Sequence, residues 1–313
     1  MIDSDALEAV IKPTISLIMS TRNRGHRLQP CLRAIERLKC KRPWELILID
    51  NGSTDETRTI LDDYGQLHLD AEITIATEPR AGLSRALNKC LELAKGEIIA
   101  FMDDDCYPNS DLLDRIIEAM ERRRLDYLGG RVELFDRNDA HITIKTDSQP
   151  SDIPAHSYVR PGLLHGCNMA IRRRVFDRVG SFDSAFGVGG FFRSSGDVEF
   201  LQRASLAGFI GGYEPSVITS HHHRRQGPAV ARLRRSYAVG RGAFYAKLTL
   251  FNPSFMGKLL AERRNAAGST FALLKIFYWT IRRNMGIAGY VSFGFFLYFA
   301  ACPFVALLRR LRS

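Results

Sequence analysis

The sequence lacks several features that would assign a protein class directly. Its six cysteines occur singly, and no C-x-x-C pair is present in the 313 residues. This pattern is typical of a reducing compartment and predicts no zinc site. Cys31 and Cys90 fall in step with apolar helix positions, so we expect both in the core. Residues 1–12 are acidic and lack an apolar run long enough for a signal peptide, which predicts a cytoplasmic domain.

Acidic residues are almost absent from the end of the chain. Residues 224–313 hold 16 Lys and Arg and a single acid, Glu262, whereas residues 1–223 hold 28 Lys and Arg and 33 Asp and Glu. The formal net charge of +10 is therefore carried by a basic C-terminal region that follows a mildly acidic domain. A basic tail can bind nucleic acid, but the apolar composition of this one favours a membrane, and we expect no nucleic-acid partner.

The stretch 286–308 contains no charged residue and is dominated by Phe, Tyr, Leu, Val and Ile. A helix of this length can span ~30 Å of hydrocarbon. The stretch is flanked by arginines that suit anionic lipid headgroups: Arg282, Arg283, Arg309, Arg310 and Arg312. Two alternatives to a span stay open, a helix lying on the membrane surface and a buried helix pair broken near Gly286–Gly289 and Pro303. We expect residues 226–313 to be helical and to associate with the cytoplasmic face of a membrane.

The first part of the chain alternates strand and helix patterns. The strand candidates are nearly continuous apolar runs, as expected for strands buried on both faces: Thr14–Ser20, Glu45–Asp50, Glu72–Thr77 and Glu97–Met102. Apolar residues at helical spacing lie between them. This order predicts an α/β fold with a Rossmann-like, mostly parallel sheet flanked by helices.

Four local predictions complete this description. A capping box is expected at Ser53–Glu56, a flexible loop over the site at Asp136–His156, a helix at Gly196–Ala207 and a short strand at Val217–Thr219.

Polar residues follow each predicted strand. Thr21-Arg22-Asn23-Arg24 comes after the first, Asp50-Asn51-Gly52-Ser53 after the second, Glu78-Pro79-Arg80 after the third and Asp103-Asp104-Asp105 after the fourth. Ligands of open α/β sheets bind outside the carboxyl ends of the strands. The sequence therefore predicts a nucleotide site there.

Asp103-Asp104-Asp105 is the strongest single indication of chemistry. Three consecutive acids behind an apolar strand repel one another unless a cation lies among them. Their hard oxygen atoms favour Mg²⁺ or Mn²⁺ together with phosphate. The alternative is an N-cap cluster for a helix at Asn109–Met120, although capping needs only one such residue.

Two further groups are candidates for the same site. In the run His221-His222-His223, a neutral imidazole would complete a metal site, and the alternative is a solvated loop. Asp197 and Glu199 lie near the start of a predicted helix, where one carboxylate can act as general base. The alternative for this pair is ordinary acidity at a helix N-terminus.

Several motifs in order resemble those of the family-2 glycosyltransferases, which have the GT-A fold. Across residues 14–225 these are SLIMSTRNR, LILIDNGSTDET, GLSRALNKCLELAKGEIIAFMDDDCYP, GCNMAIRRRVFDRVGSFDSAFG and GDVEFLQRASLAGF. Ser20, Leu87 and Gly196 stand where the family commonly has Pro, Arg and Glu. Pro215 and His221 match a proline followed six residues later by a histidine.

The resemblance implies a role for each candidate residue. The donor-binding set would be Thr21, Asn23, Arg24, Asp50, Asn51, Arg80, Asp103 and Asp104, with Asp50 accepting a hydrogen bond from the base. A divalent metal, Mn²⁺ or Mg²⁺, would be held by Asp103, Asp105 and His221. Asp197 would deprotonate the acceptor hydroxyl, which implies inversion at the anomeric carbon.

The resemblance also implies partners and a domain plan. A nucleotide-sugar donor is expected, UDP-linked in the first instance, with a glycan or lipid-linked acceptor. Residues 1–225 would form the catalytic domain, divided into a nucleotide-sugar half at 1–130 and an acceptor half at 131–225. The absence of a Q-x-x-R-W motif disfavours a processive synthase. Two alternatives stay open, a catalytically silent scaffold with this fold and a sugar-nucleotide pyrophosphorylase.

Overall fold

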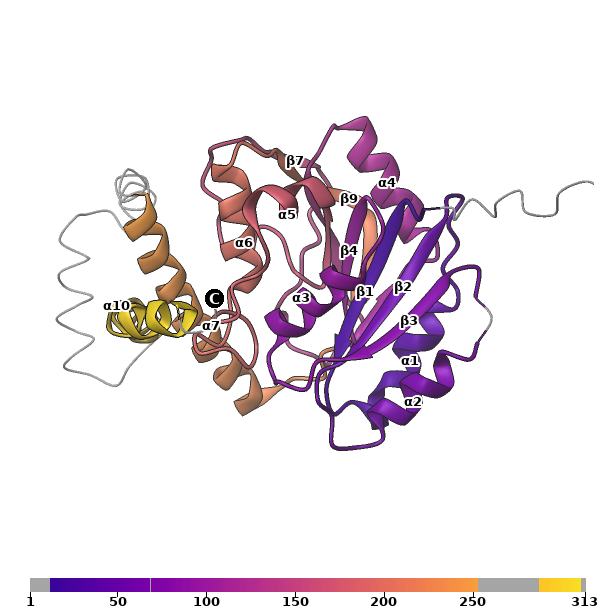
Figure 1. The fold of residues 1–313 in the computed structure, drawn as a ribbon, viewed down its shortest axis with the longest axis horizontal. Coiled ribbons are helices and arrows are strands. Elements are labelled where there is room, and N and C mark those ends of the chain that lie inside the picture. Colours follow the sequence, from indigo (N-terminus) through magenta and orange to yellow (C-terminus); the bar gives the residue numbers. More distant parts are fainter. Residues whose placement is uncertain (1–11, 68, 253–286, 311–313) are drawn as a thin grey trace, which may run out of the picture.

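The fold is described from a computed structural model, which covers residues 12–67, 69–252 and 287–310 (Figure 1). The first 103 residues supply the regular α/β part, built from β1 (Ile15–Thr21), α1 (Gly25–Ile35), β2 (Trp44–Asp50), α2 (Thr57–Tyr64), β3 (Glu72–Thr77), α3 (Leu83–Leu93) and β4 (Ile98–Asp103). Strands β3, β2, β1 and β4 lie side by side and pair in parallel. The four predicted strands are confirmed to within one residue at each end.

The second part extends the same sheet. Its elements are β5 (Cys106–Pro108), α4 (Leu112–Arg122), β6 (Tyr127–Leu134), β7 (Ser151–Ile153), β8 (Asn168–Arg172), α5 (Arg173–Val179), α6 (Gly196–Leu206) and β9 (Gly211–His221). The strand order is β3-β2-β1-β4-β8-β6-β9-β5, with β7 paired to β9.

The sheet is mixed: the prediction of a mostly parallel sheet is confirmed for β1 to β4 and is wrong for most of the strands added beyond them. Parallel pairing holds from β3 to β4 and for β6 with β9, whereas β8 lies antiparallel to both β4 and β6, and β5 and β7 lie antiparallel to β9. From β1 to β4 a single helix connects each strand to the next, and these crossovers impose parallel pairing. Beyond β4 the helical period that indicated crossovers is interrupted, and strand direction is set by long-range pairing.

Two hydrophobic clusters cover the two faces of the sheet. Alternation along β1 directs Leu17 and Met19 to one cluster and Ile18 to the other. Figure 1 shows α1, α2 and α4 on one side of the sheet and α3, α5 and α6 on the other. Cys31 and Cys90 are fully buried, one in each cluster, which confirms that both are core residues.

Helix α7 (Gly227–Phe251) packs onto the α3–α5–α6 side, where Ala243 and Phe244 join the hydrophobic cluster. Helix α10 (Ile287–Arg310) crosses α7 at short range. A Cβ on Gly242 would lie 1.9 Å from the carbonyl oxygen of Val291, and one on Gly294 1.9 Å from that of Val239. Glycines are therefore required at this crossing. The first helix of the C-terminal region, α7, therefore packs as part of the folded domain.

No helix within the described ranges is both long and apolar enough to cross a membrane. The candidate segment 286–308 is described only in part, because the description leaves out residue 286 and the side chains of residues 287, 288 and 302–308.

The predicted capping box at Ser53–Glu56 is wrong. Helix α2 begins at Thr57 without a side-chain cap. The Asp55 carboxylate instead accepts hydrogen bonds from the backbone N–H of Thr57, at 3.0 Å, and of Gly25, at 3.2 Å. The Asp55 carboxylate thereby joins the starts of α1 and α2. Residue spacing within the segment 53–56 does not predict this contact with a distant helix.

The polar stretch Asp136–His156 is more ordered than a flexible loop. Strand β7 lies within it and pairs with β9, and Lys145 forms an isolated bridge with Val132. Its predicted place over the site is confirmed, because residues 141–143 line the cavity described next.

Candidate active site

A cavity of about 690 Å³ opens where β1 and β4 end. The parallel register places Thr21 beside Asp50 and Ser20 beside Asp103, so the ends of neighbouring strands meet at one edge. Nine of the polar side chains around this cavity come from segments far apart in the chain: Thr21, Arg24, Asn51, Asp103, Asp104, Asp105, His165, Asp197 and His221.

The three acids of the run have different partners. Asp104 accepts a hydrogen bond from the Thr21 hydroxyl at 2.7 Å and lies 3.3 Å from Arg24 Nε. Asp105 Oδ1 lies 3.2 Å from His221 Nε2, and its Oδ2 lies 3.9 Å from the Arg24 guanidinium. One arginine and one histidine therefore face three carboxylates.

Electrostatics make this cluster receptive to a cation. Burial, and then the nearby charge of Asp105, raise the pKa of Asp103 to about 7. Burial also opposes ionisation of Asp105, but the hydrogen bond from His221 and the positive charges of His221 and Arg24 together outweigh burial and hold the pKa of Asp105 below its usual value. Burial alone would lower the pKa of His221, but the same bond together with the nearby negative charges of Asp105 and Asp103 raises this pKa to about 9. A divalent cation would relieve the repulsion between the carboxylates.

Strand alternation separates the three histidines. His221 points to Asp105, while His222 contacts Tyr107 and the ring of Phe135 on the other side. His223 Nε2 donates to the carbonyl oxygen of Ala140 at 2.8 Å. Only the first histidine of the run reaches the acidic cluster.

Thr143 orients the His221 ring. Its hydroxyl donates to the carbonyl of Ile142 at 2.5 Å and lies 3.1 Å from His221 Nδ1. The hydroxyl hydrogen is thus already used, so Nδ1 is assigned as the donor to the Thr143 oxygen. Nε2 is then the atom that faces Asp105, and its lone pair becomes available to a metal once its proton has left, as in ligand histidines.

Two of the three predicted metal ligands lie close enough together to hold one divalent metal. Ligand atoms of Asp105, Cys106 and His221 lie within 4.8 Å of one another, whereas Asp103 is not a member of that compact group. Asp105 and His221 are suitable ligands for Mn²⁺. Asp103 contributes its charge to the same cavity.

Asp197 and Glu199, separated by one residue, have different environments. Asp197 lies in the first turn of α6, after Ser195 in the left-handed region at φ 67°, and its carboxylate lines the cavity. Glu199 is buried and forms ion pairs with Arg203, at 2.9 Å, and Lys247, at 2.6 Å. Only Asp197 is available to a substrate.

Three predicted donor-binding residues hold the loops of the strand ends. Asn51 lines the cavity, but its amide bonds the backbone of Glu78, Arg80 and Gly82. The Asp50 carboxylate accepts from the backbone N–H of Ser53 at 3.1 Å, and the Asn23 side chain accepts from that of Thr54 at 2.8 Å.

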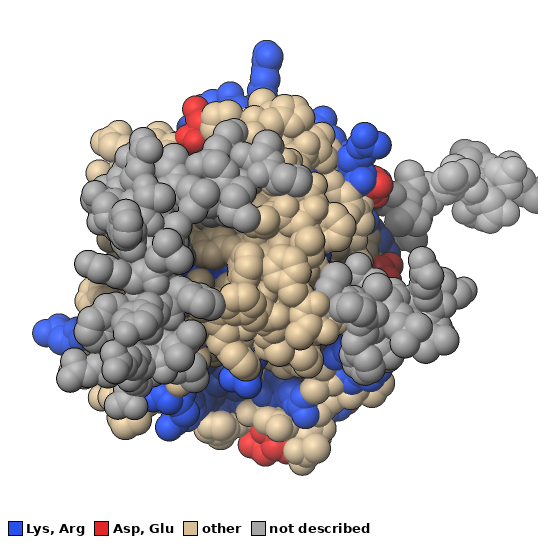
Figure 2. All heavy atoms as spheres, turned by 90° about the vertical axis from the view of Figure 1, so that its left-hand side faces the viewer, with Lys and Arg blue, Asp and Glu red and all other residues tan. Residues whose placement is uncertain are grey.

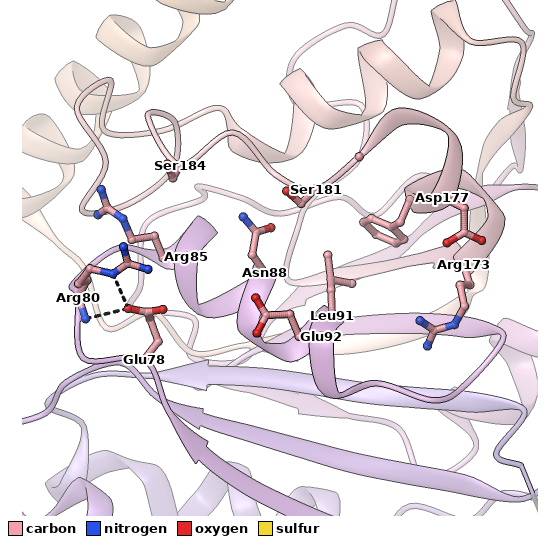
Figure 3. A pocket seen from close by; sticks show the side chains of 12 residues that line it. Glu78, Arg80, Arg85, Asn88, Leu91, Glu92, Arg173, Asp177, Ser181 and Ser184 are labelled. Atoms are coloured by element: carbon pink, nitrogen blue, oxygen red, sulfur yellow. Dashed lines mark hydrogen bonds and ion pairs between the residues drawn. The ribbon is translucent and has the colours of Figure 1, made fainter. Parts of the chain in front are cut away.

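Arg80 is separate from the others. Its Nε lies 3.1 Å from Glu78 Oε1, and its side chain lines a groove of about 550 Å³ on the α3 and α5 surface. Figure 3 shows it turned toward Glu78 there. Neither Arg80, Asp50 nor Asn23 lines the larger cavity.

Sequence reasoning missed four lining residues. His165 precedes β8, and Arg225, Tyr237 and Arg241 come from α7 or the residues just before it, which the composition assigned to a tail. Neither Arg225 nor Arg241 forms an ion pair within the described part of the chain. For α7 and the residues just before it, the sequence showed only a high positive charge and did not indicate that the helix packs beside the cavity.

The family model described as Glycosyl transferase family 2 matches residues 16–180, about half of the chain. The chain belongs to this family. Among its relatives, the glycosyltransferase AglE of Haloferax volcanii is 29% identical over 231 residues, 74% of this chain and 73% of that protein.

Two other similar proteins have informative names. "UDP-Glc:alpha-D-GlcNAc-diphosphoundecaprenol beta-1,3-glucosyltransferase WfgD" of Escherichia coli is 27% identical over 40% of this chain and 47% of its own length. Mannosyltransferase PcManGT of Pyrobaculum calidifontis, in a structure with GDP-Man and Mn²⁺, has a TM-score of 0.60 and 20% identity, covering 92% of this chain and 81% of that one. The latter likeness shows a shared fold.

Proposed function

We propose that this family-2 glycosyltransferase is a metal-dependent, inverting enzyme that moves one sugar from a nucleotide-sugar donor to a hydroxyl of a membrane-borne, lipid-linked glycan. The observation that carries the proposal is one cavity that holds both an Asp105–His221 pair and the Asp197 carboxylate. The pair suits the diphosphate end of a donor, and Asp197 suits an attacking hydroxyl.

The donor side is assigned to the strand ends. Asp105 and His221, with Asp103 beside them, would hold the metal, which when bound neutralises charge on the departing nucleoside diphosphate. Arg24, fixed by Asp104 and Asp105, adds a positive charge at the same edge. Asp50 and Asn51 lie beside this edge and shape the loop for the base. UDP is the nucleotide to test first, because the name of one relative includes UDP-Glc. GDP is the second, because the similar structure of the mannosyltransferase contains GDP-Man.

The acceptor side is assigned to Asp197. As the sugar is attacked, the acceptor hydroxyl loses its proton to the Asp197 carboxylate, and the bond to the nucleoside diphosphate breaks on the opposite face. A single displacement of this kind inverts the anomeric carbon. Glu199 forms ion pairs with Arg203 and Lys247, and its role in this proposal is to hold α6 in place.

The proposed function is tested by transfer itself. Full-length protein, labelled donor sugar and a membrane lipid extract should yield a labelled lipid with Mn²⁺ and little with EDTA. Proton NMR of the lipid-borne glycan, with the new glycosidic bond intact, should show the anomeric configuration opposite to that of the donor. Retained configuration would overturn the inverting mechanism, and label only in free sugar would overturn the lipid acceptor.

The membrane part of the proposal rests on α7 and α10. Phe293, Phe296 and Phe299 are 49%, 53% and 38% exposed, at a spacing that places them on one face of α10. Three exposed arginines of α7 lie nearby, Arg232, Arg234 and Arg235, the last above the Tyr290 ring of α10 at 6.0 Å. Figure 2 shows a wide uncharged area bordered below by a band of Lys and Arg. An apolar face beside arginines is complementary to an anionic bilayer.

Removing the three arginines should weaken vesicle binding. Each basic residue near an anionic surface is worth about 1 kcal/mol, so the triple change Arg232→Gln, Arg234→Gln and Arg235→Gln should lower partition roughly 100-fold. The measurement is co-sedimentation with phosphatidylserine vesicles. The matched control changes Arg42, Arg58 and Arg115, exposed arginines of the other half, to Gln. Equal partition of the two triple variants would contradict this surface.

A further inference from the structure

The edge pair β5–β9 brings a thiol to the metal-binding cluster. Cys106 and His221 are direct partners in this antiparallel pair, so their side chains project from the same face. Asp105 precedes Cys106 and contacts His221 Nε2 at 3.2 Å. One ligand atom from each of these three residues lies within 4.8 Å of the other two.

A second thiol lies against the first. Cys167 precedes β8, lines the cavity and interacts electrostatically with the Cys106 thiol, although its sulfur is not a member of the compact group of three. Both cysteines are buried, and both are free. The compact group thus offers one carboxylate, one thiol and one imidazole, and Cys167 adds a second sulfur near Cys106 from a third segment of the chain.

Ligand softness distinguishes two kinds of cation here. Mn²⁺ and Mg²⁺ prefer the oxygen atoms of Asp105 and Asp103 and the phosphates of a donor. Thiolates select zinc and similar cations, which take four ligands in a tetrahedron from Cys, His and Asp. The cluster offers that tetrahedral set only if the metal moves from the carboxylates toward Cys106.

We propose that Asp105, Cys106, His221 and Cys167 form a thiophilic site that binds Zn²⁺ in place of the catalytic metal and inhibits the enzyme. Binding forms two metal–sulfur bonds and one metal–nitrogen bond, and it releases the two thiol protons and the Nε2 proton of His221 to solvent. It withdraws Asp105 and His221 from the hard cation and leaves no open position for a phosphate oxygen. The absence of a C-x-x-C pair predicted no zinc site, but the fold unites cysteines from distant segments.

Binding of Zn²⁺ to the four residues does not depend on the proposed function, whereas inhibition of the enzyme by Zn²⁺ rests on it. Each of the two claims therefore has its own measurement. Cd²⁺ titrated into full-length protein should produce the ultraviolet charge-transfer absorption of a metal thiolate. Cys106→Ser and Cys167→Ser should each reduce that absorption. Cys90→Ser, a buried thiol of α3 outside the cavity, is the matched control and should keep it. No absorption in the natural protein, or full absorption in both Cys106→Ser and Cys167→Ser, would overturn the site.

The second measurement is Zn²⁺ inhibition of sugar transfer in the presence of Mn²⁺, relative to each variant's own rate with Mn²⁺ alone. Cys106→Ser should need at least about tenfold more Zn²⁺ for half inhibition, since one ligand is lost. Unfolding temperatures check that each variant is folded. If the Cd²⁺ absorption appears but Zn²⁺ does not inhibit transfer, the thiol site is retained and the proposal that Zn²⁺ replaces the catalytic metal is overturned. Absence of transfer under all conditions would instead count against the proposed function.

Discussion

Asp105→Ala is expected to lower kcat/KM for sugar transfer roughly 10²- to 10³-fold, the usual effect of removing one preorganised electrostatic group from a reacting centre. Asp105 is the carboxylate that contacts His221 at 3.2 Å, so its removal takes away one metal ligand and leaves the other without its partner. Rates measured over a range of Mn²⁺ concentrations should show that the variant needs far more metal for its residual activity.

A similar pair outside the cavity provides the control for Asp105. Asp139 is a buried carboxylate 3.8 Å from His223, the next inward-facing histidine of the same run, and it does not line the cavity. Asp139→Asn removes a comparable charge and should keep the natural metal requirement. If both variants lose activity to the same degree, the loss reflects folding of this edge, and the assignment of Asp105 as a ligand fails.

Asp197→Asn is expected to lower kcat roughly 10²- to 10⁴-fold while donor binding is retained, because a general base typically contributes a factor of that size. Asparagine keeps the shape of the side chain and its hydrogen bond from the Val198 backbone N–H at 2.8 Å. The amide does not accept the proton. Steady-state transfer and donor affinity should be measured on the same preparation.

Glu199→Gln is the matched control on the same turn of α6. It disturbs the buried ion pairs with Arg203 and Lys247, so we expect a lower free energy of unfolding but a kcat near the natural value in the folded fraction. The base assignment would be wrong if Asp197→Asn turned over normally, or if Glu199→Gln alone abolished transfer in folded protein.

The sequence predicted the part of the fold whose local patterns agree with its tertiary environment. Strands β1 to β4 are buried apolar runs, and the run Asp103–Asp105 follows β4 at the edge where ligands of such sheets bind. Hydrophobic period and strand order suffice for these features.

The rest depends on contacts between distant segments. The antiparallel insertion of β8 beside β4 leaves no local signal, and it changes the sheet from mostly parallel to mixed. Arg225, Tyr237 and Arg241 reach the cavity because α7 packs on the domain, although composition indicated only a basic tail. The pairing of Cys106 with His221 likewise depends on the β5–β9 register.

The resemblance to the family supplied roles that composition and spacing do not contain. It singled out Asp197 rather than Glu199, and the two carboxylates indeed have different environments in α6. For Asp50, Asn23 and Arg80 the donor-binding role stays a prediction, since their side chains bond to neighbouring loops or line another groove.

The most direct test of a metal-dependent donor site is calorimetric titration of the natural protein with UDP-, GDP- and dTDP-sugars, with Mn²⁺ and with EDTA, beside Asp105→Ala. We expect one nucleotide class to bind with Mn²⁺ and to lose most of its affinity both in EDTA and in the variant. No binding of any donor in either condition, or equal binding by the variant in EDTA, would contradict the assignment.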